Sequence, residues 1–432
     1  MAGAAVTFAA GAALASPFAE PDVTVLNSFY AEQAGDGYGW VAEAIGDLDG
    51  DGAAEYVIGA PFSNAGGNQS GRAYVYAGAT GALLAVHTGA PGDRLGFSIT
   101  GLGDVDGDLV PDYAVSGLAV TGVNLPGRAL VLSGATHEIV HDLAGGVDAF
   151  FGFDIQNARD VDCDGVSDLI VGSIFANGGA GEVTMFSGRT GATLWTQAGF
   201  SASGQLGSAV TGTDDLDGDG VPDQVVGART DGPDGTGLAY VLSGADGAML
   251  DVLAPPSAAA GRFGAFFAHD VGDLDGDRVA DVYISDFADG TLAPNSGRGY
   301  VFSGATGEAV LTIEAISAGE GLGMARGAGD LDRDRRADLI VGAYLHGDVA
   351  EQGGQARLIS GCDGRVIRTM TGTEAGHQLG FDVVALGDVN GDRRPDWLIT
   401  GVDVAHVVAG NRIERRWCGC HDDDDDNDDD DQ

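Results

Sequence analysis

Seven copies of a short acidic segment recur along this 432-residue chain, 55 to 58 residues apart. Each copy carries acids, or in one case an amide, at its first, third, fifth and ninth positions. Carboxylates held in one tight turn repel each other, and a divalent cation among them turns that repulsion into attraction. The candidate metal ligands are Asp47, Asp49, Asp51 and Glu55; Asp104, Asp106, Asp108 and Asp112; Asp160, Asp162, Asp164 and Asp168; Asp215, Asp217, Asp219 and Asp223; Asp273, Asp275, Asp277 and Asp281; Asp330, Asp332, Asp334 and Asp338; and Asp388, Asn390, Asp392 and Asp396.

The ligand types in these loops favour calcium. Calcium accepts about six to eight oxygens in loose geometry, magnesium demands a stricter octahedron, and transition metals prefer the His and Cys ligands that do not recur here. An EF-hand is excluded, because its twelfth position needs a bidentate Glu and the first loop has Ile58 there. We therefore expect up to seven Ca²⁺ ions, with one negative charge fewer in the seventh loop, where Asn390 replaces an acid.

Two details distinguish the loops from one another. The sixth position is Gly52 in the first loop and is the one most in need of a positive φ angle, although other copies place Leu or Arg there. The sixth loop departs furthest, because Arg333, Arg335 and Arg336 lie among its acids. We expect these arginines to neutralise part of the loop's charge without a metal.

The segments around each loop predict β-strands. A short apolar run follows the loop directly, as in Tyr56-Val57-Ile58 and Leu339-Ile340-Val341. A third alternating strand, such as residues 72–78, stops at a glycine turn, and a fourth such as residues 83–87 follows. Four strands in each of seven repeats predict an all-β fold, a seven-bladed β-propeller of four-stranded antiparallel blades.

Two glycine motifs recur with the same period. A glycine with large apolar neighbours precedes each loop, as in Tyr38-Gly39-Trp40 and Phe151-Gly152-Phe153, and a turn such as Gly59-Ala60-Pro61 follows the strand after it. This order resembles the FG-GAP repeats of integrin α-subunit head domains and of many bacterial secreted proteins, over roughly residues 22–417. The resemblance implies a seven-bladed propeller with calcium in loops on one face, and a role in adhesion or ligand recognition.

The resemblance says less about the ligand, which we expect to be an extracellular protein or glycan. The spacing of the loops leaves no room for the inserted ligand-binding domain that some integrins carry between blades. Ligand contacts are expected instead in the loops that differ between repeats. The alternative is that these loops vary only because surface loops tolerate changes in length and composition. The segments are 64–70, 120–126, 229–236, 288–296 and 346–354.

The charge is unevenly distributed. The net charge is −44, and the seven loops hold 27 of the 65 acidic residues, while the run from Asp422 to Asp431 holds nine. The rest of the chain is only mildly acidic, and a surface of this sign argues against binding nucleic acid or anionic lipid. We expect a monomeric propeller that does not insert into a membrane.

The termini suggest an extracellular or cell-surface location. Residues 1–19 are mostly Ala and other apolar residues, with candidate cleavage sites at Ala13-Leu14-Ala15 and Phe18-Ala19, and resemble a secretory signal that lacks the basic n-region. A flexible apolar leader is the alternative. The propeller is then expected over residues 20–418, and residues 419–432 are expected to be a disordered poly-Asp tail, with a weak calcium sink or a recognition tag as the alternatives.

Three further features are open in the sequence. Cys362 could form a disulfide with Cys418 or Cys420, and Cys418-Gly-Cys420-His421 could bind zinc, although a fourth ligand is lacking. The ring can be closed by residues 23–30 as an N-terminal clasp or by residues 412–417 within the last blade. We favour the N-terminal clasp.

No enzyme motif stands out. The eight His residues share no repeat position, and none lies in a nucleophile, zinc-hydrolase or phosphate-loop motif. We therefore expect an adhesion or recognition module without catalytic residues or organic cofactor. The alternatives are a structural surface or matrix protein and a calcium-dependent polysaccharide-processing enzyme.

Overall fold

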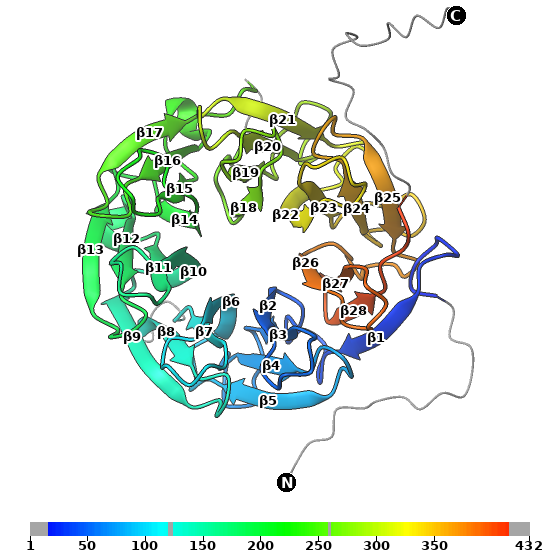
Figure 1. Cartoon of the computed structure of the whole chain (residues 1–432), viewed down its shortest axis with the longest axis horizontal. Coiled ribbons are helices and arrows are strands. Elements are labelled where there is room, and N and C mark those ends of the chain that lie inside the picture. Colours follow the sequence, from blue (N-terminus) through cyan, green and yellow to red (C-terminus); the bar gives the residue numbers. More distant parts are fainter. Residues whose placement is uncertain (1–15, 120–123, 258–260, 414–432) are drawn as a thin grey trace, which may run out of the picture.

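A computed structural model describes residues 16–119, 124–257 and 261–413. Seven four-stranded antiparallel sheets surround a central axis (Figure 1), so the predicted seven-bladed propeller is confirmed. Helical structure in the described residues is limited to two 3₁₀ turns, η1 (Ala176–Gly179) and η2 (Pro233–Gly235). No helix in these residues is long and apolar enough to cross a bilayer.

Each of blades one to six uses four consecutive strands, numbered outward from the axis. Blade one has β2 (Ala42–Gly46), β3 (Glu55–Ala60), β4 (Arg72–Tyr76) and β5 (Leu83–Thr88); blade two has β6 (Leu95–Gly103), β7 (Asp112–Gly117), β8 (Pro126–Leu132) and β9 (Ile139–Val147). Blade three has β10 (Phe151–Arg159), β11 (Asp168–Ser173), β12 (Glu182–Phe186) and β13 (Thr193–Ala198); blade four has β14 (Leu206–Gly212), β15 (Gln224–Ala228), β16 (Leu238–Leu242) and β17 (Met249–Leu253). Blade five has β18 (Ala268–Gly272), β19 (Asp281–Asp286), β20 (Arg298–Phe302) and β21 (Ala309–Glu314); blade six has β22 (Leu322–Gly329), β23 (Asp338–Ala343), β24 (Gln355–Ile359) and β25 (Val366–Thr371).

Blade seven closes the ring with strands from both ends of the chain. Its inner strands are β26 (Val383–Gly387), β27 (Asp396–Gly401) and β28 (Val404–Val408), and its outer strand is β1 (Val25–Tyr30). β1 pairs antiparallel with β28, with Val25 opposite Val408 and Tyr30 opposite Val404. The predicted N-terminal clasp is therefore confirmed, while residues 414–417 of the alternative strand lie outside the described part of the chain.

The hydrophobic core lies between neighbouring blades, because each inner strand buries both of its faces. On β3, the side chain of Val57 packs toward Ile99 of blade two. Its neighbours Tyr56 and Ile58 pack on the other side, toward Leu398 of blade seven. This two-sided burial explains why the strand after each acidic loop is a continuous apolar run rather than an alternating one.

The two recurring glycine motifs meet at the contacts between blades. Gly172, in the turn-type motif of blade three, lies against Gly207, in the motif that opens blade four. A Cβ atom on Gly172 would lie 2.1 Å from the carbonyl oxygen of Gly207. The inner strands can approach this closely only because both positions lack a side chain.

Candidate metal sites and axial cavity

The seven acidic loops connect the first and second strands of each blade. Successive strands of a blade run in opposite directions, so all seven loops lie on one face, which we call the acid-loop face. In five loops, three acids offer ligand oxygens within 4.8 Å of one another. These groups are Asp47, Asp49 and Glu55; Asp104, Asp106 and Asp108; Asp160, Asp162 and Asp168; Asp215, Asp217 and Asp223; and Asp273, Asp275 and Asp281. Oxygens at this separation can all reach one ion at calcium's ligand distances of about 2.3–2.6 Å.

The first aspartate of each loop organises the backbone around it. Asp47 accepts hydrogen bonds from the backbone N–H groups of Gly50 (2.7 Å), Asp51 (3.2 Å) and Gly52 (2.9 Å). Further along the turn, Asp49 accepts a bond from the N–H of Asp51 at 3.1 Å. The carboxylates thus converge because the loop folds onto them, as asparagine and aspartate turns do.

The predicted positive φ at the sixth loop position is confirmed. Gly52 has φ of +92°, and the non-glycine residues at this position adopt the same conformation, with Leu109 at +71° and Arg278 at +75°. The fourth position is also left-handed, which we did not predict: Gly50 has φ of +79° and Cys163 +60°. Cys163 is exposed and is a free thiol.

The ninth acid has a second role that the sequence did not indicate. Asp168 is fully buried and accepts hydrogen bonds from the backbone N–H of Val161 (2.8 Å), Asp162 (3.2 Å) and Gly188 (2.9 Å). Gly188 lies in the turn that follows β12, the third strand of the same blade, so this carboxylate connects the acidic loop to that turn. The same bond to a glycine N–H recurs in all seven blades. The available signal was a recurring glycine, which lies 20 to 23 residues after the ninth acid in blades one to six and 14 residues after it in blade seven.

Burial makes these ninth-position acids sensitive to charge. Burial raises the pKa of Asp168, Asp281 and Asp338 to about 6, against the lowering effect of the backbone N–H groups. Burial disfavours the ionised form of a carboxylate, and a cation beside the carboxylate stabilises that form. The donor set therefore fits a hard cation such as Ca²⁺.

The sixth loop differs from our expectation in its arginine partner. Arg365, in the turn between β24 and β25, forms an ion pair with Asp332. Arg336 instead donates to the carbonyl oxygen of Leu274 at 2.9 Å, in blade five. Asp332 is only 1% exposed, and its Oδ1 atom has no hydrogen-bond partner among the described residues. An unpartnered buried carboxylate oxygen is what a cation site would leave, so this loop also retains a possible ligand.

The opposite face carries a ring of aromatic side chains around the axis, and we call it the aromatic face. Ring centroids of Trp40 and Phe97 lie 5.5 Å apart, those of Phe97 and Phe153 5.6 Å, and those of Phe153 and Phe266 5.3 Å. Phe381 lies 5.2 Å from Trp40. Four of these five residues directly follow the glycine of the motif that opens a blade, and Phe266 lies two residues after it. This was the sequence signal that we did not interpret.

Blade four has no aromatic residue at this position, and an arginine completes the ring there. Ser208 follows the motif glycine, and its hydroxyl accepts a bond from the backbone N–H of Arg229 at 3.1 Å. The guanidinium carbon of Arg229 lies 5.1 Å from the centroid of Phe153 and 5.6 Å from that of Phe266. Burial lowers the pKa of Arg229, and cation–π contact with two rings offsets part of that desolvation.

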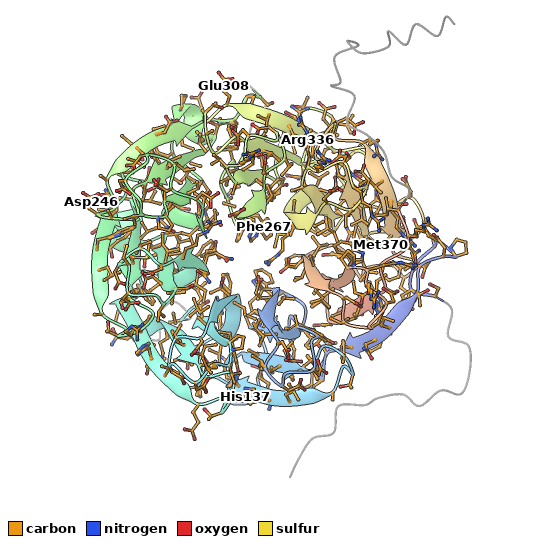
Figure 2. All side chains as sticks on the ribbon, viewed as in Figure 1. His137, Asp246, Phe267, Glu308, Arg336 and Met370 are labelled. Carbon is orange, nitrogen blue, oxygen red and sulfur yellow. The ribbon has the colours of Figure 1, made fainter. Side chains whose placement is uncertain are left out.

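Inside this ring lies an axial cavity of about 270 Å³. Its walls are aromatic, and Phe267 points toward the central opening in Figure 2. Its polar lining includes Asp154, His269 and Arg326. A second, polar cavity of about 590 Å³ shares Gln156, His269 and Arg326 with the first and extends to Gly329 and Ala337, next to the sixth acidic loop.

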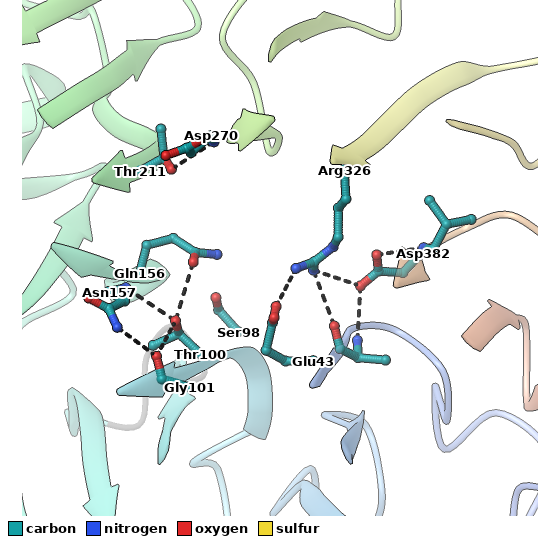
Figure 3. A network of polar contacts seen from close by, with 12 residues as sticks. Glu43, Ser98, Thr100, Gly101, Gln156, Asn157, Thr211, Asp270, Arg326 and Asp382 are labelled. Atoms are coloured by element: carbon teal, nitrogen blue, oxygen red, sulfur yellow. Dashed lines mark hydrogen bonds and ion pairs between the residues drawn. The ribbon is translucent and has the colours of Figure 1, made fainter. Parts of the chain in front are cut away.

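Charged groups between the two cavities connect distant blades (Figure 3). Arg326 forms an ion pair with Glu43, lies 3.5 Å from Asp382 and donates to the carbonyl oxygen of Ala42 at 3.1 Å. Burial raises the pKa of Glu43 and of Asp382, while Arg326 acts in the opposite direction on both. The cluster is therefore an ionic bridge in which Arg326 stabilises the ionised forms of both buried acids.

Two other titratable side chains line the axial cavity. Asp154 accepts bonds from the Ser98 hydroxyl (2.9 Å) and the Val210 N–H (2.8 Å), and burial raises its pKa to about 7. His269 is 9% exposed, its Nε2 atom has no partner among the described residues, and burial lowers its pKa well below the ordinary value.

The predicted ligand loops share the aromatic face. All of them lie between the second and third strands of a blade. In the loop of blade two, residues 120–123 lie outside the described part of the chain. One of them is anchored by a buried cluster, in which Glu320 accepts bonds from Arg357 at 2.6 and 2.9 Å and contacts His346 at 3.0 Å. His346 and Arg357 hold the pKa of Glu320 down to about 2, against its burial. The loop that begins at His346 is therefore fixed to blade six.

The cysteine predictions are partly tested. Cys362 is disulfide-bonded. Its predicted partners, Cys418 and Cys420, and the alternative zinc site at Cys418-Gly-Cys420-His421 lie outside the described residues.

Comparisons with known proteins agree with this geometry. The FG-GAP repeat family matches residues 39–76. Integrin alpha-PS2 of Drosophila melanogaster is 32% identical over 177 residues, which is 38% of this chain and 12% of that protein. Integrin alpha-8 of Gallus gallus is 27% identical over 191 residues (40% and 18%), and human integrin alpha-IIb is 32% identical over 180 residues (36% and 17%). The chain thus spans less than a fifth of the length of these relatives.

Among solved structures, the chain is similar to BBS1N in its complex with ARL6DN, with a TM-score of 0.54, 11% identity, and coverage of 91% of this chain and 98% of that one. This similarity concerns the propeller fold alone. The chain therefore carries a match to the FG-GAP repeat, is similar to integrin α subunits over part of its length, and folds as a seven-bladed β-propeller.

Proposed function

We propose that this chain is an extracellular, calcium-binding recognition module that holds a protein or glycan ligand on its aromatic face. Up to seven Ca²⁺ ions in the acid loops stabilise the blades from the opposite face. The observation that carries the proposal is the separation of two surfaces. The loops that differ between blades and the aromatic-lined cavity share one face, while the repeated acidic loops occupy the other.

The chemistry of each face supports this division. Aromatic rings around a concave opening supply contact area with little loss of conformational freedom, and a few polar groups at the floor orient a ligand. Acidic loops with weak calcium affinity suit the millimolar calcium found outside cells. The matched integrin α subunits support an adhesive role at the cell surface for a chain that acts as a monomer and not as an enzyme.

The experiment is binding of the purified full chain to an array of glycans and matrix proteins in about 1 mM calcium, repeated in chelator. Selective binding that is lost in chelator supports the proposal. The substitution Trp40→Leu should weaken that binding, since it removes one side of the aromatic ring. The matched control is Phe200→Ala, because Phe200 is 42% exposed and contacts Tyr240, away from the cavity lining.

Other outcomes would contradict the proposal. A folded chain that binds nothing on the array favours a structural surface or matrix protein. Turnover of any glycan in calcium favours a polysaccharide-processing enzyme.

A further inference from the structure

A groove lined by arginines lies on the acid-loop face between blades six and seven. Its volume is about 780 Å³. Its lining contains five arginines and a single acid, Asp330; the arginines are Arg333, Arg368, Arg393, Arg394 and Arg412. The chain has 21 basic residues in all, every one of them arginine, against 65 acids. Five arginines beside one acid are therefore an unusual concentration of positive charge in this protein.

Most of these guanidinium groups have no strong partner. Arg333, Arg393 and Arg412 are exposed, and no ion pair joins their side chains to another described residue. Arg394 lies 3.9 Å from Asp392, a weak contact in solvent. Arg368 lies 3.2 Å from Asp22, which is largely exposed. The groove thus presents unneutralised positive charge above an apolar floor that includes Trp397 and Ile413.

The described part of the chain ends in this groove. Ile413, the last described residue, belongs to the lining. Nine residues later the sequence enters the acidic run from Asp422 to Asp431. Nine extended residues span about 30 Å, which is more than enough to turn back over the groove.

The predicted disulfide would shorten that path. Cys362 belongs to the turn that follows β24, whose residue Leu358 lines the groove. If its partner is Cys418 or Cys420, the acidic run begins within four residues of a covalent anchor on blade six. A tether of this length holds the acidic run at a millimolar effective concentration.

We propose that the acidic C-terminal run, Asp422 to Asp431, docks intramolecularly in the arginine groove. Polycarboxylate matches the charge of the groove, and the attachment point favours the chain's own segment over a separate polyanion, which the net charge of −44 would repel. This inference does not depend on the function proposed for the aromatic face.

The first experiment compares the reactivity of arginines toward phenylglyoxal in the full chain and in a chain that lacks residues 422–432, both in calcium. Mass spectrometry gives the rate at each arginine. We expect Arg393 and Arg412 to react several times faster when the run is absent. The matched control is Arg278, which occupies the same loop position in blade five as Arg393 does in blade seven, and its rate should not change.

A second experiment measures the affinity of a fluorescent peptide with the sequence of residues 421–432 for the shortened chain. Each exposed arginine contributes about a two- to fivefold change in affinity, so Arg393→Gln with Arg412→Gln should weaken binding about four- to twenty-five-fold. Arg278→Gln should leave it unchanged. Salt at about 1 M should weaken binding strongly, because it shortens the screening length to about 3 Å.

Three results would overturn the proposal. Equal phenylglyoxal rates at Arg393 and Arg412 in the two chains would show an open groove. Protection confined to Arg415 and Arg416 would mean that the run pairs only with its neighbours in sequence. Equal binding of an added sulfated or uronate polysaccharide to the full and shortened chains would assign the groove to an external polyanion.

Discussion

The guanidinium of Arg326 on the inner strand of blade six forms an ion pair with Glu43 on the inner strand of blade one. These blades are neighbours of blade seven on either side, so the pair spans the one blade that is assembled from both ends of the chain. Asp382, on the approach to the inner strand of blade seven, lies 3.5 Å from the same guanidinium. Ring closure is therefore held by an ionic contact at the axis as well as by β1 at the circumference.

Replacing this arginine should destabilise the fold strongly. Arg326→Met leaves Glu43 and Asp382 buried without their cation, and an uncompensated buried charge costs about 3–5 kcal/mol. Urea unfolding in calcium measures the loss. The control is Arg298→Met, whose partner Glu314 is 68% exposed, so that its removal should change stability by less than about 1 kcal/mol. Equal effects of the two substitutions would contradict the assigned role of Arg326.

Calcium removal should lower the melting temperature substantially. A site with a dissociation constant of about 0.1 mM contributes about 1.4 kcal/mol at about 1 mM calcium, and seven such sites together approach the whole stability margin of a typical domain. Calorimetry with and without chelator tests this. The loop variant Asp49→Asn should lose part of the calcium effect, whereas Glu308→Gln, at the outer circumference in Figure 2, should not. An unchanged melting curve in chelator would show that calcium does not stabilise the blades.

The ninth acid of each loop should stabilise the fold even without calcium. Asp168→Asn replaces an acceptor of three backbone N–H bonds by a group that can accept only at its carbonyl oxygen, and a buried N–H left unsatisfied costs about 1–3 kcal/mol. We expect this loss of stability in chelator. Asp162→Asn, at the exposed third position of the same loop, should be close to neutral there and destabilising only in calcium. Identical behaviour of the two variants in chelator would refute the separate structural role.

Asp154 should give the stability a specific pH dependence. Its pKa is about 7 in the folded chain and about 3.9 in an unfolded one, so between these values the folded state binds the extra proton. Unfolding free energy therefore falls as pH rises from about 4 to about 7. Asp154→Asn should remove on the order of 2 kcal/mol of that decline, less than the full shift implies because the side chain is partly exposed to the cavity. The exposed Asp246→Asn is the control, and parallel pH profiles of wild type and Asp154→Asn would rule this out.

Phe18 places a constraint on processing of the predicted leader. Phe18 is 2% exposed, packs with Met370 and lies 5.6 Å from the ring of His406. Phe18→Ala should lower stability by about 3 kcal/mol, compared with little change for Ile316→Ala, which is 59% exposed. Cleavage after Ala15 keeps Phe18, whereas cleavage after Ala19 removes it. Mass spectrometry of the secreted chain should therefore find Ser16 at the N-terminus, and a chain that begins at Glu20 would contradict this.

The sequence by itself determined the repeat, the number of blades and the tight turn of the acidic loops, although not the left-handed fourth position of that turn. These properties are local: the loop is closed by bonds between residues three to five positions apart, such as those that Asp47 accepts. A positive φ at the sixth position follows from the same short turn, whether Gly52 or Leu109 occupies it. Periodicity then identified the blades, because each repeat must bury its strands against the next.

Only the tertiary structure decided which distant side chains meet. Segments 23–30 and 412–417 both carry a strand-like pattern, and the pairing of β1 with β28 selected the first as the clasp. Arg365 rather than the nearby Arg333, Arg335 or Arg336 pairs with the sixth loop, because the turn after β24 brings it there. The aromatic ring, the bridge through Arg326 and the arginine groove each join residues from different blades, and closure of the ring sets their separation rather than any spacing along the chain.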